Sequence, residues 1–74
     1  MLDVEAAAEI ALDYLNQRFP LEDDEIVVFD AMETRDAWVF QYNSRRYLET
    51  HDLLYALVEG RPIRVSKHDG SVSL

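Results

Sequence analysis

The 74-residue sequence has no cysteine, two glycines and no apolar run long enough to cross a bilayer. Without cysteine it can form neither disulfides nor thiolate metal sites, which is compatible with a reducing cytoplasm. The longest apolar run, residues 53–58, is far short of the ~20 residues that span a membrane. The first five residues carry no base, so we expect no secretory signal. These absences predict one small cytoplasmic domain, residues 1–74, with no membrane contact.

Basic residues are scarce in the first half of the chain. Residues 1–34 carry ten acids against Arg18 alone, a net charge of −9, whereas residues 35–74 carry five acids and six bases. The whole chain has a net charge of −8 and a pI of about 4.4. An acidic surface repels phosphate backbones, so we expect no nucleic-acid partner. It would attract and steer a basic protein partner, although acidity also serves solubility alone.

Small apolar residues recur at three- and four-residue spacing from residue 3 to residue 18, which predicts an amphipathic helix. Asp3 is a suitable N-cap, Arg18 suits the negative end of the helix dipole, and Pro20 stops the helix. A face rich in alanine can lie close against a sheet. That face comprises Val4, Ala7, Ala8, Ala11, Leu12 and Leu15.

The segment 37–44 alternates as a strand does, and it carries the largest apolar side chains. Trp38, Phe40 and Tyr42 fall on one side, so we expect that side to form the floor of the core beneath the helix. A second β-rich segment precedes it at 26–33. Its alternation places two sets of residues on opposite faces: Ile26, Val28 and Asp30 on one, Val27, Phe29 and Ala31 on the other.

The chain after residue 44 is less regular. Residues 45–60 match neither a clean helical stripe nor a clean strand, and we expect an irregular excursion containing a helical turn. Residues 63–67 and 71–74 then alternate as strands, joined by a turn at 68–70 with Asp-Gly at its tip. The predicted fold is α+β, with one N-terminal helix packed on a meander of three to five antiparallel strands.

Residues that could carry chemistry are few. His51 and His68 are each followed by an aspartate, but adjacent side chains point apart and neither pair forms a dyad. The histidines also lack metal-ligand spacing on one element. With glycine only at positions 60 and 70, no loop can cradle a phosphate. We therefore expect no enzyme activity, metal or cofactor.

Binding through protein contact is better supported. Arg45 and Arg46 follow the aromatic strand and could bind carboxylates of a partner, or could pair with Glu49 on the same turn. Tyrosine is common both at interfaces and at core edges. The candidate partner-binding residues are Arg45, Arg46, Tyr47, Glu49, Tyr42 and Tyr55.

The run Trp38-Val39-Phe40-Gln41-Tyr42-Asn43-Ser44 resembles the central motif of the immunity protein 35 family, also called YrhB-domain proteins. Further residues follow in that family's order: Tyr47-Leu48-Glu49-Thr50, Ala56-Leu57, Gly60, Pro62-Ile63, Val65 and Asp69-Gly70. The resemblance covers residues 26–72. The sequence departs from the family pattern in two places. Relatives usually have a Gly-Asn-Gly-Pro-like turn where this chain has Glu59-Gly60-Arg61-Pro62, and they often have an acid where it has Ser66. A partner surface that included those positions would differ here.

The resemblance implies a non-catalytic immunity protein that binds and blocks a cognate bacterial toxin. The acidic field agrees with a toxin whose surface is basic. An alternative is a chaperone-like or accessory protein that binds exposed apolar segments of many clients. A homodimer is a third alternative, because one helix covers only one face of the sheet.

Overall fold

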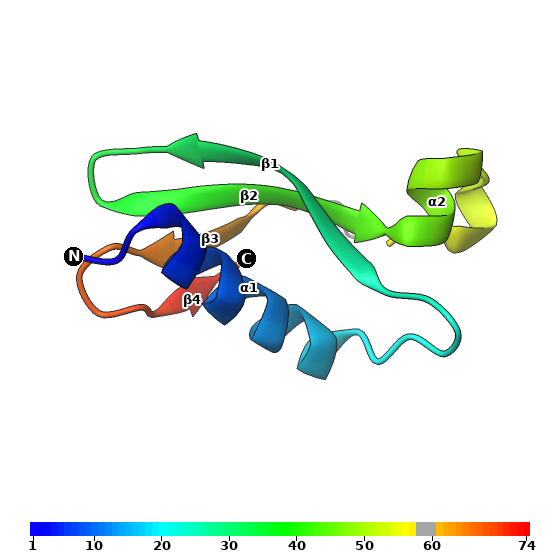
Figure 1. Cartoon of the computed structure of the whole chain (residues 1–74), viewed down its shortest axis with the longest axis horizontal. Coiled ribbons are helices and arrows are strands. Elements are labelled where there is room, and N and C mark those ends of the chain that lie inside the picture. Colours follow the sequence, from blue (N-terminus) through cyan, green and yellow to red (C-terminus); the bar gives the residue numbers. More distant parts are fainter. Residues whose placement is uncertain (58–60) are drawn as a thin grey trace.

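The structure is a computed structural model that describes residues 1–57 and 61–74 (Figure 1). Its strands form one antiparallel sheet in the order β1-β2-β3-β4, with the first helix packed on one face. This is the predicted α+β meander. In chain order the elements are α1 (Val4–Arg18), β1 (Ile26–Glu33), β2 (Ala37–Ser44), α2 (Arg45–Thr50), the 3₁₀ helix η1 (Leu53–Tyr55), β3 (Ile63–Ser66) and β4 (Val72–Ser73).

Helix α1 begins and ends at the residues that its sequence marks. A side-chain oxygen of Asp3 accepts a hydrogen bond from the Ala6 N–H at 2.9 Å, which caps the start. Arg18 occupies the last turn, and the chain leaves the helix at Phe19, directly before Pro20. The predicted helix at 3–18 is confirmed to within one residue.

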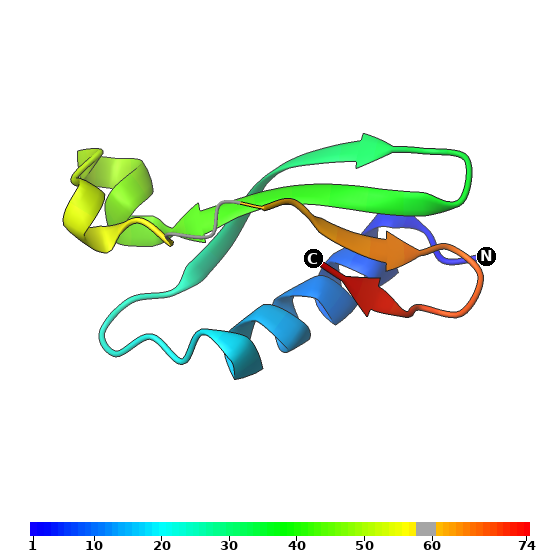
Figure 2. The same ribbon diagram turned by 180° about the vertical axis from the view of Figure 1, so that it is seen from behind.

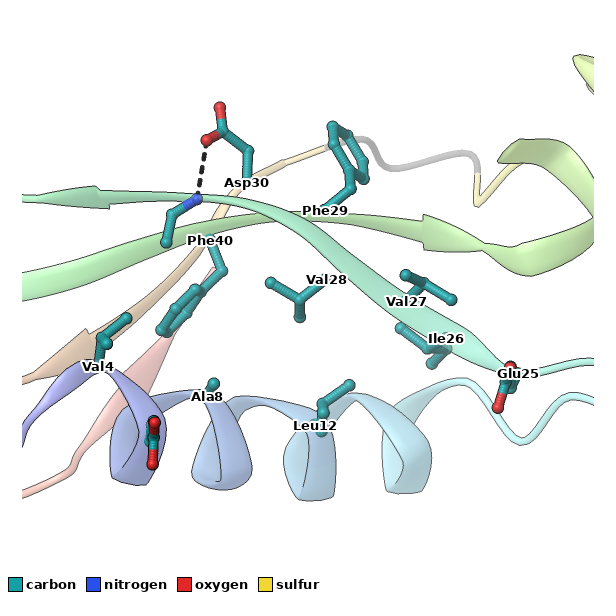
Figure 3. Close-up of a pocket in the computed structure, with 12 residues that line it drawn as sticks. Val4, Ala8, Leu12, Glu25, Ile26, Val27, Val28, Phe29, Asp30 and Phe40 are labelled. Carbon is teal, nitrogen blue, oxygen red and sulfur yellow. Dashed lines mark hydrogen bonds between the residues drawn. The ribbon is translucent and has the colours of Figure 1, made fainter. Parts of the chain in front are cut away.

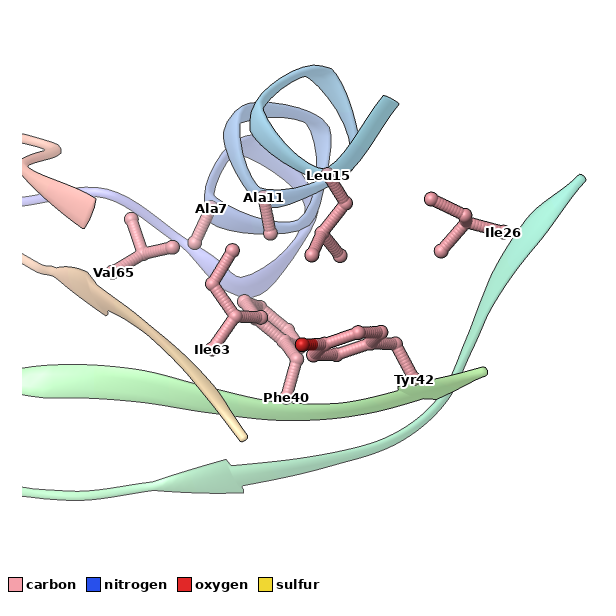
Figure 4. Packing of buried hydrophobic residues seen from close by; sticks show 8 residues of the cluster. All are labelled: Ala7, Ala11, Leu15, Ile26, Phe40, Tyr42, Ile63 and Val65. Carbon is pink, nitrogen blue, oxygen red and sulfur yellow. The ribbon is translucent and has the colours of Figure 1, made fainter. Parts of the chain in front are cut away.

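The alanine-rich face of α1 packs on the aromatic face of β2, as predicted (Figure 4). Phe40 and Tyr42 lie in the centre of this core. Trp38 lies at its margin and is only partly buried, with its indole N–H donating to the Leu2 carbonyl at 3.0 Å. The buried cluster consists of Ala7, Ala11, Leu15, Ile26, Phe40, Tyr42, Ile63 and Val65.

The expected alternation along β1 is wrong beyond Val28. The pairing register with β2 shifts between Val28 and Asp30, so Phe29 is an extra residue, a β-bulge. Directly paired residues share a face of the sheet, and Ala31 pairs with Phe40. The bulge therefore turns Ala31 toward α1, whereas simple alternation had placed it on the opposite face.

The turn between β3 and β4 is the predicted Asp-Gly turn. Gly70 adopts a φ of 73°, in the left-handed region that favours glycine, and its N–H donates to the Ser66 carbonyl at 3.1 Å. A Cβ at this position would stand 3.2 Å from Cδ1 of Ile10 on α1. The turn is therefore fixed by close approach to the helix as well as by its own geometry. Strands β3 and β4 are shorter than the predicted 63–67 and 71–74.

The segment after β2 forms the predicted excursion, with helical turns at α2 and η1 (Figures 1 and 2). Both lie beyond the end of the sheet, and the molecule is elongated, with extents of 36 × 20 × 19 Å. At the other end, the N-terminus runs beside the β3–β4 turn, where the Leu2 N–H donates to the Lys67 carbonyl at 2.9 Å. Residues 58–60, including Val58 and part of the expected turn at 59–62, lie outside the described residues.

Candidate functional site

The side chain of Ser44 joins β2 to the two short helices that follow. Its hydroxyl oxygen accepts from the Tyr47 N–H at 3.1 Å, which caps α2. The same hydroxyl donates to the carbonyl of Tyr55, in η1, at 2.5 Å. Ser44 is itself almost fully buried. We call residues 44–57 the α2–η1 cap, because this one side chain ties its parts together at the end of the sheet.

Asn43 supplies a second tie. Its side-chain oxygen accepts from the Ser44 N–H and from the Leu57 N–H, each at 2.9 Å. The chain leaving η1 is thereby fixed to the last residues of β2. A 3₁₀ helix of three residues would not persist alone, so these two side chains account for its position.

The acidic connector after α1 is bonded to the first residues of α2. A carboxylate oxygen of Asp24 accepts from the N–H of Glu25 at 2.8 Å and of Arg46 at 3.2 Å. The Arg45 N–H donates to the Glu25 carbonyl at 2.8 Å. Desolvation raises the pKa of Asp24, but the two N–H donors together with the Arg46 charge outweigh it and hold that pKa below 3.8. The cap is therefore anchored on two sides.

Both candidate arginines make contacts within the protein. The Arg45 Nε lies 3.6 Å from a carboxylate oxygen of Glu25 and 3.8 Å from one of Glu49, and all three side chains are more than half exposed. This is the pairing with Glu49 considered as the alternative, and exposed pairs of this kind are weak. Arg46 instead places its guanidinium 5.4 Å from the centre of the Tyr55 ring.

The candidate residues do not all come together. Arg45, Arg46, Tyr47 and Glu49 lie on α2, and Tyr55 lies on η1 beside them. The Tyr47 ring is partly buried, whereas Tyr55 is partly exposed under Arg46. Tyr42 is separate, because its ring lies in the core and only 6% of the residue is exposed.

The most exposed apolar side chains of the cap were not among the candidates. Leu53 and Leu54 are 79% and 87% exposed. Their spacing resembles that of residues with a buried face, and nothing in the sequence distinguishes them from core leucines. Only the position of η1, fixed by Asn43 and Ser44, turns them outward. Exposed leucines beside an arginine and a tyrosine form a surface suited to protein contact.

The histidines and acids considered for metal binding are dispersed over the described residues. Across residues 1–57 and 61–74, no three acidic or histidine side chains gather closely enough to hold a metal ion. His51 closes α2 with a positive φ, and its ring packs against Tyr47 at 6.1 Å. The Nε2 of His68 lies 3.7 Å from a carboxylate oxygen of Asp36, with both side chains exposed. No described helix is both long and apolar enough to cross a membrane.

The structure thus combines a small α+β meander with a braced cap that exposes apolar side chains. The family model described as Immunity protein 35 matches residues 5–74, and the chain belongs to that family. Membership implies a role in neutralising a toxin, and proteins of this family are generally non-catalytic. No curated protein and no solved structure matches the chain.

Proposed function

We propose that this protein neutralises one cognate bacterial toxin by binding it directly in the cytoplasm, without turning anything over. The observation that carries this proposal is the family match over residues 5–74. The net charge of −8 favours a toxin whose binding surface is basic. The contact we assign first is the α2–η1 cap.

Three properties of the cap support that assignment. It lies at one end of the molecule, so a partner can approach it without displacing the sheet (Figure 1). Ser44 and Asn43 hold it in place, and a pre-organised surface loses less entropy on binding. It combines Arg46 and Tyr55, residue types that often carry binding energy, with the exposed apolar surface of Leu53 and Leu54.

Long-range attraction should act through the acids of the first half of the chain. The Debye length falls from ~10 Å at 0.1 M salt to ~3 Å at 1 M, so association should slow as salt rises. Reversing the charge of Glu9, Asp13 and Glu22 together should slow association more than it speeds dissociation. Stopped-flow mixing with the purified toxin would separate the two rates.

The decisive test is co-expression with the toxin encoded beside this protein's gene. Survival that depends on this protein is the expected result. Equal killing with and without it would overturn the proposal. The double variant Arg46→Ala with Leu54→Ala should weaken protection if the cap makes the contact. Arg64→Ala, an exposed arginine on β3, is the matched control and should protect fully.

A chaperone-like activity is the second candidate, and the exposure of Leu53 and Leu54 is the observation that favours it. Such a protein would suppress the heat-induced aggregation of unrelated proteins. Salt would not abolish this suppression, because apolar contacts would drive the binding. A toxin-specific protein would show one tight, salt-sensitive partner instead. Sedimentation of the isolated protein would show whether it is a monomer or a homodimer, and so test the third alternative.

A further inference from the structure

Strand β1 is an open edge of the sheet. Among the described residues it pairs with β2 alone and stands at one end of the strand order. It is eight residues long, and its second half is exposed. A strand at a sheet edge presents unpaired backbone N–H and C=O groups, to which a further strand can bond.

A groove runs between this strand and α1 (Figure 3). Its volume is about 580 Å³. Ala8 and Leu12 of α1 face Val28 and Phe40 of the sheet across it, so its floor is apolar. A side chain entering from the open edge of β1 would meet this apolar surface.

The other side of the same edge is also apolar. The bulge residue Phe29 is 55% exposed and projects away from α1 in Figure 3. Met32 is 59% exposed and pairs with Val39, on the face opposite the helix. Side chains of an added strand would alternate between the two faces. One set would enter the groove and the other would lie along Phe29 and Met32.

The rim of the groove is acidic. Glu5 of α1 and Glu25 of the connector line it, and no lysine or arginine is among its described lining residues. The Asp30 carboxylate stands on the other side of β1, away from α1, and accepts from the Ala31 N–H at 2.9 Å (Figure 3). A second copy of this chain would bring the same acids to the same edge and be repelled. A strand carrying lysine or arginine would be attracted. The charge at this edge therefore disfavours a second copy of this chain and favours a basic strand from another protein.

We propose that β1 and the α1–β1 groove bind an extended, basic segment of a partner polypeptide as a fifth strand. Its apolar side chains enter the groove, and the lysines or arginines that alternate with them lie on the other side of β1, where the Asp30 carboxylate stands. The proposal rests on the proposed function only in taking that partner to be the toxin. The groove meets the α2–η1 cap at Glu25, which lines the groove and also contacts Arg45. One partner can thus engage both surfaces.

The probe for a first test is a synthetic octapeptide that alternates lysine with valine. It is titrated into the ¹⁵N-labelled protein. We expect amide shifts along residues 26–33 and the first two turns of α1. A peptide in which glutamate replaces lysine should bind about tenfold more weakly or worse. Shifts confined to the cap, or equal binding of the glutamate peptide, would overturn the proposal.

Backbone pairing is tested separately from charge. Two lysine–valine peptides carry N-methyl groups on alternate amides, one in each phase. Alternate amides of a strand point to the same edge, so each peptide lacks the N–H donors of one edge and keeps every side chain. The peptide whose methylated edge faces β1 should lose binding, and the other should keep it. If both methylated peptides bind as well as the parent, the contact is electrostatic only and the fifth strand is excluded.

Asp30→Lys, which reverses the acid beside the lysines of the added strand, should weaken the parent peptide about tenfold, and Glu5→Lys on the rim of the groove should weaken it less. Asp13→Lys on the exposed face of α1 changes the net charge equally and should leave affinity almost unchanged. Equal loss of affinity in all three variants would assign the effect to overall charge and overturn the site.

The co-expression assay separates the groove site from the immunity role. If Asp30→Lys and Glu5→Lys both protect cells fully from the toxin, the proposed groove site is wrong but the immunity role stands. If the wild type binds the peptide but does not protect cells, the immunity role is wrong but the site stands.

Discussion

The ammonium nitrogen of Lys67 lies 2.6 Å from a carboxylate oxygen of Glu33, across the face of a tryptophan. The same nitrogen is 5.1 Å from the centre of the Trp38 ring. The Lys67 side chain is only 9% exposed, whereas that of Glu33 is 59% exposed. A cation at the margin of the core is thus held by one carboxylate and one aromatic face.

Removing the carboxylate should therefore cost more than removing the cation. Glu33→Gln leaves the buried ammonium without its counter-charge, and we expect a loss of about 1–3 kcal/mol in the free energy of unfolding. Lys67→Met keeps the volume and leaves a carboxylate that water can solvate, so about 1 kcal/mol or less should be lost. Urea titrations of both variants, with Glu22→Gln as an exposed control, measure which variant loses more free energy of unfolding. A larger loss for Lys67→Met would contradict it.

Ala11 is fully buried where α1 lies on the sheet. Ala11→Lys should overpack this contact, at about 1–3 kcal/mol, with a further cost for burying the ammonium. Asn16→Lys places the same side chain on the exposed face of the helix and should change the denaturation midpoint little. Equal midpoints for the two variants would rule out the packing of α1 described above.

Ser44→Ala tests whether one hydroxyl holds the α2–η1 cap. The variant loses the N-cap of α2 and the bond to the Tyr55 carbonyl, so the cap should open while the core stays folded. Hydrogen exchange should quicken at the Tyr47 and Leu57 amides, with little change at Phe40. Ser73→Ala, at an exposed position on β4, is the control. Unchanged exchange in the cap would mean that other contacts suffice.

The β3–β4 turn should give the fold a dependence on acid pH. The Ser71 N–H donates to the Asp69 carboxylate at 2.9 Å, and this bond, aided by the hydroxyls of Ser71 and Ser66, holds the pKa of Asp69 below 3.8. Because the folded state favours the ionised form, the contribution is present above that ordinary value. It is lost as the pH falls through the lowered pKa.

The comparison is between the wild type and Asp69→Asn, unfolded in urea from about pH 6 to about pH 2. The wild type should be the more stable at the upper end, and the difference should shrink below pH 3.8. Asp13→Asn corrects for the loss of one charge. A difference that stays constant over the whole range would show that the ionised carboxylate does not stabilise this turn.

Local patterns predicted most of this fold. The helix, the aromatic strand and the Asp-Gly turn each depend on residues close in sequence, and Asp3, Phe40 and Gly70 act as their residue types suggest. The bulge at Phe29 could not be predicted, because β-rich residues continue through it and alternation carries no mark of an inserted residue. Its position depends on the register with β2.

The candidate site was predicted less completely. Arg46 and Tyr55 do lie together, as residues near each other in the chain can. The outward orientation of the η1 leucines depends on the bonds that Ser44 and Asn43 make to Tyr55 and Leu57, which span 11 and 14 residues of the chain. Tyr42 fits a core and an interface equally well by type, and only packing against α1 decides between them.

Over the paired stretch β1 uses residues 26–33 and β2 only residues 38–44, so β1 carries one extra residue beside the groove. A bulge bends the strand that contains it. Deleting Phe29 would leave the existing pairs Val28–Tyr42 and Asp30–Gln41 adjacent, so no core side chain would change face. The strand would then straighten, and the groove would lose Phe29 from its lining. If the groove binds a partner strand as proposed, loss or gain of one codon at this position would alter the groove and leave the paired core residues on their present faces.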